Sequence, residues 1–360
     1  MQYTHERNFG CRINDELTYR GLRMMVIQNE LIRVSLLLDK GTDIFEFVHK
    51  PTDTDFMWRS PRGVRPKTNN HVMRPHENGP FSDFYEGGWQ EILPNGGRRC
   101  EYRGCEMGQH GEVWGVPWKH EILENTPEVC SVKLWVRTDR TPYLLEKTLT
   151  VRTGSPVLEI DESVTNESDQ DLDMMWGHHP AFGPPFLSEN CVVSSGAQTV
   201  VVDPNVPQDG RFEAEQEFDW PTGTARDGSE VDVRKILAPE DELEDMLYLT
   251  DLTDGWYAIT NQEKKIGFGM AFDAEVFEHI WYWISLCGNP DWPSWGEFYV
   301  IALEPFSSYP AILTECMKEN RQLKIAGGET ISTWMRAVAY EGYTDVAGIS
   351  PLGEVTGVEG

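Results

Sequence analysis

The sequence predicts an all-β protein, on three observations. Segments with strand character dominate the 360 residues, and most of them alternate in polarity or are rich in Val, Ile, Trp and Tyr. Clusters of Gly, Asn, Asp and Pro separate these segments, as turns do. The spacing of apolar residues predicts one short helix, over residues 310–320. With 39% hydrophobic residues, 13 Trp, 12 Tyr and 15 Phe, the chain has enough apolar material for a packed core.

The predicted strands follow one another along the chain, and each is an apolar or alternating stretch that ends at a turn cluster. They span residues 24–29, 31–38, 43–49, 129–138, 144–153, 157–166, 191–195, 198–202, 255–261, 266–272, 279–286, 297–303 and 332–341. A further strand is expected from Leu172 toward Pro180. The helix falls in "PAILTECMKEN", directly after Ser-Ser-Tyr.

One large domain is expected, because all-β sandwiches and barrels often exceed about 200 residues as a single unit. No internal repeat, Ser/Gly linker or charge block divides the chain. The polar stretch 203–245 is interpreted as an insertion beside the main fold. The domain is placed at residues 1–342, and residues 343–360 are expected to form a flexible tail, because they lack periodicity.

The charge balance limits the partners. Asp and Glu number 59 against 31 Lys and Arg, a formal charge of -28. Such a surface repels nucleic acid and anionic membranes, so neither is an expected partner. The N-terminal "MQYTHERNFG" is polar and no apolar run of about 18 residues occurs, which predicts a cytoplasmic protein.

The seven cysteines predict no disulfide framework, since their number is odd and they are widely spread. Cys100 and Cys105 form a C-x4-C pair without a second Cys or His pair at zinc spacing, so they are interpreted as ordinary thiols. The sequence contains no GxGxxG motif for a nicotinamide cofactor. Neither a cofactor nor a metal is expected.

Two adjacent histidines stand in "MMWGHHPAFGP". If the strand from Leu172 continues through them, alternation points His178 and His179 to opposite faces. Leu172, Met174 and Trp176 share the parity of His178, which predicts that His178 lies on the core face. His179 is the candidate for an open position, with Gly177 leaving room beside it. A structural role for either histidine is the competing interpretation.

Two further residues are candidates for acid–base chemistry. His110 lies between Gly108 and Gly111 in "MGQHGEVWGVPW", a loop that allows close backbone approach. Its tryptophans could stack on a sugar or simply fill the core. Glu304 ends the apolar stretch "EFYVIALEP". A carboxylate at such a position is expected either to be solvated or to have a functional role. A histidine and a glutamate together can exchange protons with a substrate near neutral pH.

These motifs resemble the aldose 1-epimerase (galactose mutarotase-like) superfamily over almost the whole chain. "GGWQEILPNGG" followed by "GQHGEVWGVPW" is similar to the family's Gly-Gly segment and the loop with its first active-site histidine. "GHHPAFG" is similar to the turn with the second histidine, and "IALEPFSSYP" to the stretch with the catalytic glutamate. The resemblance implies a β-supersandwich with a sugar site on the concave face of one sheet.

The resemblance also implies site residues. His179 would be the general acid, Glu304 the general base, and His110 a residue that binds and polarises the sugar ring. Further residues are expected to bind the substrate, and the binding Arg has Arg98 and Arg99 as rivals. These substrate-binding candidates are Arg74, Asp245, Trp114, Gln109 and Trp89.

The implied reaction is exchange of the α and β anomers of an aldose by ring opening. Relatives that act on hexose 6-phosphates carry an Arg before the Gly-Gly segment, where this chain has Glu86, so a phosphosugar is not the expected substrate. The expected partner is a monosaccharide, whose identity stays open and includes uronates and sulfonated sugars, and the chain is expected to be a monomer or a homodimer. The alternatives are a non-catalytic carbohydrate-binding module and a glycoside-processing hydrolase or lyase.

Overall fold

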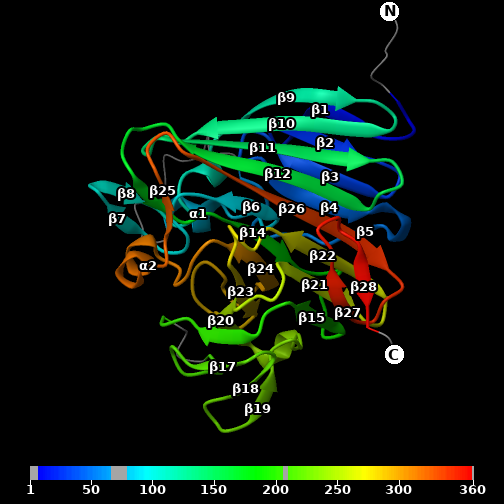
Figure 1. The fold of residues 1–360 in the computed structure, drawn as a ribbon. Coiled ribbons are helices and arrows are strands. Elements are labelled where there is room, and N and C mark those ends of the chain that lie inside the picture. Colours follow the sequence, from blue (N-terminus) through cyan, green and yellow to red (C-terminus); the bar gives the residue numbers. More distant parts are fainter. Residues whose placement is uncertain (1–6, 66–78, 206–209, 359–360) are drawn as a thin grey trace, which may run out of the picture.

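The fold consists of two large antiparallel sheets packed face to face, as seen in a computed structural model that describes residues 7–65, 79–205 and 210–358. Figure 1 shows the two layers, with the two helices and the β7–β8 hairpin gathered at the left. One sheet has 12 strands and the other 8, which confirms the predicted all-β fold. Helices α1 (Gly79–Phe84) and α2 (Leu313–Glu319) are too short to cross a membrane, and no described helix is a candidate span.

The larger sheet follows the order β1-β2-β3-β4-β6-β14-β24-β23-β20-β16-β17, with β5 paired to β4. Its strands are β1 Arg12–Tyr19, β2 Leu22–Gln28, β3 Ile32–Leu37, β4 Asp43–His49, β5 Thr54–Asp55, β6 Trp89–Ile92, β14 Gly177–Phe182, β16 Thr199–Val202, β17 Glu217–Asp219, β20 Leu243–Thr250, β23 His279–Leu286 and β24 Tyr299–Phe306.

The smaller sheet follows the order β15-β21-β22-β26-β12-β11-β10-β9. Its strands are β9 Lys119–Asn125, β10 Val129–Arg137, β11 Tyr143–Arg152, β12 Val157–Asn166, β15 Cys191–Ser195, β21 Trp256–Asn261, β22 Ile266–Phe272 and β26 Thr330–Glu341. Four two-stranded pairs lie outside the main sheets: β7 Cys100–Tyr102 with β8 Cys105–Met107, β13 Leu172–Met174 with β25 Leu323–Ile325, β18 Thr222–Thr224 with β19 Glu230–Asp232, and β27 Val346–Ile349 with β28 Val355–Gly357.

The predicted strands and helix are present, and all seven cysteines are free thiols, as expected. The prediction of one continuous strand from Leu172 to Pro180 was wrong, because β13 and β14 are separate strands with different partners. The stretch 203–245, interpreted as an insertion beside the main fold, contains β17, β18 and β19 and reaches into β20, an interior strand of the larger sheet. Its many charged residues concealed the alternation of β20.

The tail expected from residue 343 is part of the fold. Val346 and Ile349 of the β27–β28 hairpin are buried and pack with Trp256, Val338 and Tyr340. The stretch 343–358 lacks a long apolar period because its hairpin needs only a few apolar contacts, which periodicity does not reveal. The expected boundary at residue 342 is therefore corrected for the described residues.

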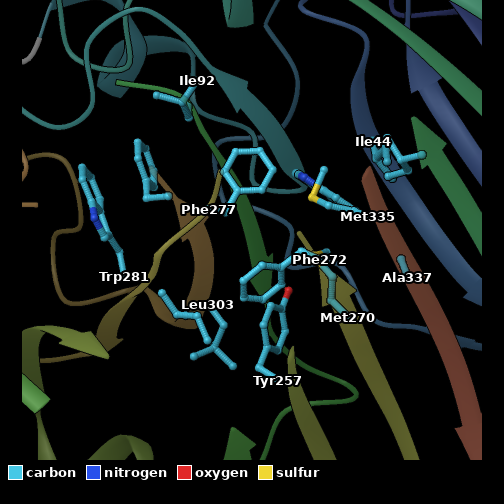
Figure 2. Close-up of a cluster of buried hydrophobic side chains, with 14 of the residues drawn as sticks. Ile44, Ile92, Tyr257, Met270, Phe272, Phe277, Trp281, Leu303, Met335 and Ala337 are labelled. Carbon is cyan, nitrogen blue, oxygen red and sulfur yellow. The ribbon is translucent and has the colours of Figure 1, made fainter. Parts of the chain in front are cut away.

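The hydrophobic core fills the space between the two sheets. Leu303 of the larger sheet and Tyr257, Met270 and Met335 of the smaller sheet contribute to one continuous cluster of buried side chains. Figure 2 shows these side chains directed toward one another between the layers. The central strands of the larger sheet bury one face in this core, so their opposite face is where a site can form.

A polar network crosses this core directly behind β14. The Nε2 atom of His178 lies 3.1 Å from the Oε2 atom of Glu162 on β12, and Trp89 donates its indole N–H to Nδ1 of His178 over 3.0 Å. Lys147 on β11 donates to Oε2 of Glu91 over 2.9 Å. The network joins the two sheets through hydrogen bonds where the surrounding core offers only apolar contacts.

The network balances its charge internally. One buried Lys faces two buried carboxyl groups, and burial raises the pKa of Glu162 to about 7. Three groups, Glu91, Glu162 and His178, lie close enough to surround a metal ion. However, Nδ1 of His178 accepts the hydrogen of Trp89, so in the neutral ring Nε2 carries the proton and donates to Glu162. The geometry is that of a hydrogen-bonded ion network.

Lys147→Ala should lower the free energy of unfolding by about 3–5 kcal/mol, because it leaves two carboxyl groups buried without their cation. Lys133→Ala is the matched control, since Lys133 forms an ion pair with Glu146 at the surface of the neighbouring strand. Its expected cost is below about 1 kcal/mol. Urea denaturation followed by circular dichroism measures both, and equal losses would contradict the structural role of the network.

Candidate functional site

A cavity of about 320 Å³ lies over the central strands of the larger sheet, on the face away from the core. Strands β14, β24, β23 and β20 form its floor, while α1 and the loops around residues 97–98, 109–110, 203–205, 289–294 and 311–312 form its walls. A cavity of this size fits small ligands. It is the place where the predicted catalytic residues meet.

His179 and Glu304 face each other on neighbouring strands. The register of β14 and β24 pairs Gly177 with Phe306 and Ala181 with Ala302, which places His179 directly opposite Glu304. The Nε2 atom of His179 lies 3.5 Å from Oε1 of Glu304. Sequence reasoning predicted that both residues belong to one site, and the structure brings them together on the floor of the cavity.

Burial shifts the proton equilibria of this pair in opposite directions. It lowers the pKa of His179 to about 4 and raises the pKa of Glu304 well above its usual range, because a dry site disfavours both charged forms. Both shifts favour the uncharged form of each partner, a neutral imidazole beside a protonated carboxyl group. Transfer of that one proton gives imidazolium and carboxylate without changing the charge of the site.

Tyr85 touches the other side of the His179 ring. Its hydroxyl oxygen lies 3.4 Å from Nδ1, and burial raises the pKa of Tyr85 well above its usual range, so the phenol keeps its proton. A hydroxyl oxygen that accepts a hydrogen bond from Nδ1–H leaves Nε2, the nitrogen that faces Glu304, free to take the proton of that carboxyl group. Tyr85 thus acts as a positioning residue for His179.

His110 reaches the same cavity from the loop after β8. Its ring centroid lies 5.1 Å from that of His179 and 4.2 Å from that of Phe81 on α1. His110 adopts a positive φ of 61°, in the left-handed region that few residues other than glycine take. Gly111 follows with φ 69°, and a Cβ there would lie 2.0 Å from the carbonyl oxygen of Leu93. The glycine predicted to allow close approach is required by this contact.

Gly177 serves a different purpose from the one expected. A Cβ at this position would lie 2.5 Å from the ring of Phe306, so the space beside His179 is occupied by that ring. Phe306 stacks on Trp281 with the ring centroids 3.7 Å apart. Trp281 lines the cavity. Gly177 therefore allows the packing that holds Trp281 in place.

A buried ion cluster supports the wall near Tyr85. Lys40 forms ion pairs with Asp43, over 3.0 Å, and with Glu86. Burial is the main reason that the pKa of Asp43 lies well above its usual range. Glu86, the residue that replaces the Arg of the phosphosugar relatives, is paired with a lysine here and does not line the cavity.

The substrate-binding residues predicted from the sequence have mixed outcomes. Gln109 lines the cavity and accepts a hydrogen bond from Ser82 over 3.1 Å. Trp89 does not line it, because alternation in β6 turns Trp89 toward His178 and the core. Trp114 lies behind Phe81, with 5.1 Å between the ring centroids, and supports the wall.

The charged candidates differ as well. Asp245 lines the cavity, and Arg211 donates its backbone N–H to one carboxylate oxygen and its Nε–H to the other, over 3.0 and 2.6 Å. Asp245 also pairs with Ile284, which belongs to the core face of β23. Arg98 lines the cavity, whereas Arg99 pairs with Glu106 outside it. Arg74 lies outside the described residues.

Sequence reasoning missed several residues of the cavity. The most informative are Glu244, Trp281, Trp283 and Ser285, which share the face of Glu304 through the register of β20, β23 and β24. The alternation in "HIWYWISL" could have placed both tryptophans and the serine on one face. Glu244 was not predicted as a site residue because residues 243–245, the start of β20, were assigned to the polar insertion.

Comparisons with known proteins agree with this fold. A family model described as a domain of unknown function, DUF4432, matches residues 19–337. A search of curated proteins found no match. The solved structures that are similar include a candidate aldose 1-epimerase from Klebsiella pneumoniae, with a TM-score of 0.71 and 15% identity over 92% of this chain and 83% of that one.

Two further solved structures have the same fold. A galactose mutarotase-like protein from Clostridium acetobutylicum has a TM-score of 0.65 and 14% identity, over 92% of this chain and 99% of that one. A galactose mutarotase related enzyme from Lactobacillus acidophilus has a TM-score of 0.57 and 16% identity, over 88% and 97%. The expected galactose mutarotase-like supersandwich is confirmed.

The burial of His179 predicts its titration. Because a dry site lowers the pKa of this ring to about 4, the imidazole should stay neutral from pH 7 down to pH 5 and gain its proton only near pH 4. Nuclear magnetic resonance of histidine-labelled protein measures this, with His179→Gln used to assign the signal. In urea-unfolded protein the same ring should titrate near its ordinary pKa of about 6.5. A folded-state midpoint near that value would contradict the burial of the pair.

Proposed function

The chain belongs to the DUF4432 family, and from the geometry of its cavity we propose that it is an aldose 1-epimerase, which interconverts the α and β anomers of a sugar. The observation that carries the proposal is the facing pair of His179 and Glu304, 3.5 Å apart on the floor of the cavity. The similar solved structures that are named for aldose 1-epimerase or galactose mutarotase support it.

The pair suits ring opening because it can deliver one proton and accept another. In the imidazolium–carboxylate form, Glu304 removes the proton of the anomeric hydroxyl while His179 protonates the ring oxygen, and the bond between C1 and that oxygen breaks. This leaves an open-chain aldehyde beside a protonated carboxyl group and a neutral imidazole. Rotation about the C1–C2 bond followed by the reverse transfers closes the ring as the other anomer.

Burial favours the uncharged form of each partner, which is the protonation state that remains after ring opening. The two forms differ only by one proton transferred within the pair, so the cycle needs no net exchange of protons with solvent. His110, next to His179, is placed to contact the ring of the sugar.

Glycoside hydrolysis fits the floor of the cavity less well. That reaction uses two carboxyl groups roughly 5–9.5 Å apart on either side of the bond that breaks. The residue directly across from Glu304 on β14 is His179, and on β23 the residue is Trp281. A carboxyl group with an imidazole partner matches proton exchange on a single sugar better.

Replacing either member of the pair should abolish the catalysed exchange. We expect His179→Ala and Glu304→Gln to slow mutarotation by about 10²–10⁴-fold, because each removes one proton-transfer partner. Polarimetry with freshly dissolved α-glucose or α-galactose measures the rate, and circular dichroism checks the fold. His120→Ala is the control, since His120 pairs with Asp15 away from the cavity. Full activity in either variant of the pair would exclude the proposed chemistry.

A further inference from the structure

The cavity has a second polar end that the catalytic pair does not reach. Glu244 of β20 is paired with Ser285, and Ser285 with Val300 of β24, so Glu244 lies on the same face as Glu304 but two strands away and four residues further along. Strand spacing and rise place the two Cα atoms about 10 Å apart across the sheet and 13 Å along it, or about 16 Å in all. The floor therefore extends well beyond Glu304.

The far end is built to form hydrogen bonds. Ser285 and Ser294 are both buried, line the cavity, and have hydroxyl groups without a hydrogen-bond partner among the described residues. Asn289 donates to Oε1 of Glu244 over 3.4 Å, and Trp292 lies in the same wall. Buried hydroxyl groups cost free energy unless a ligand or solvent satisfies them. Hydroxyl groups, a carboxylate and an indole are the groups that bind sugars.

A single pyranose cannot fill both ends. Its most distant hydroxyl oxygens lie roughly 6 Å apart, given bond lengths near 1.5 Å, so with a hydrogen bond on each side it spans roughly 12 Å. The carboxyl groups of Glu304 and Glu244 stand on Cα atoms about 16 Å apart, and strand side chains project roughly perpendicular to the sheet. Trp283 is half-buried and lies on this face between Glu304 and Glu244. Its ring centroid lies 5.7 Å from that of His179.

We propose that Glu244, Ser285, Asn289, Trp292 and Ser294 form a second sugar subsite, and that the preferred substrates are uncharged reducing disaccharides. The inference rests on the proposed aldose 1-epimerase function. The reducing sugar lies at His179 and Glu304, where its anomeric carbon is needed, and the second sugar lies over Ser285 and Glu244. The carboxylate of Glu244 accepts sugar hydroxyl groups and repels a phosphate or uronate at this position.

The test compares maltose, cellobiose and lactose with glucose and galactose in mutarotation assays. The wild type should show a kcat/KM at least about ten-fold higher for one of the disaccharides than for its monosaccharide. Glu244→Gln should reduce this ratio by about ten-fold, the effect of losing a hydrogen bond to a charged group. Ser294→Ala should also lower this ratio. Glu146→Gln, on the outer face of the smaller sheet, controls for the loss of a carboxylate, and melting temperatures check that each variant folds.

Two results would overturn the subsite. One is a wild type that turns over monosaccharides as well as it does every disaccharide, and the other is a ratio that Glu244→Gln leaves unchanged. If the wild type accelerates no sugar at all, the proposed function fails and tryptophan fluorescence titrations with the same sugars decide the inference separately. Tighter binding of a disaccharide that Glu244→Gln weakens would support the subsite, and equal binding of both sugar classes would refute it.

Discussion

The alternation of side chains along β14, Gly177–Phe182, determines how the core and the cavity are joined. In a strand, neighbouring residues must point to opposite faces, so two adjacent histidines are separated by the sheet itself. His178 enters the core, where it joins the network that binds the sheets together, and His179 enters the cavity opposite Glu304. The same strand thereby ties the floor of the cavity to the core, because a shift of β14 by one residue would exchange the positions of the two histidines.

Burial gives the site its chemical character. Burial of His179 and Glu304 disfavours the charged form of both side chains, which favours a pair with one transferable proton on the carboxyl group. A reaction that moves one proton off a sugar and another onto it needs a pair of this kind. The buried ion pairs near the site, Lys40 with Glu86 and Lys147 with Glu91, lie outside the lining of the cavity.

Periodicity was sufficient for the all-β fold and for the separation of His178 from His179. It failed where charge concealed a strand, as at Glu244, and where burial depends on tertiary partners, as in the β27–β28 hairpin. Trp89 was misassigned because the face that a residue takes in a short strand follows from its register, which local sequence does not specify. The prediction that His110 and His179 belong to one site came from the resemblance to a known family. Local sequence could not supply it, because only tertiary structure joins residues so far apart in the chain.

In the proposed mechanism, His179 and Glu304 act as one unit that shares a proton. The most direct measurement compares the mutarotation rates of His179→Ala, Glu304→Gln and the double variant in the same sugar. If the pair is one unit, the double variant should be about as slow as the slower single variant, because removing either partner already ends the proton exchange. If the losses multiply in the double variant, the two residues act independently, and the account of a shared proton is contradicted.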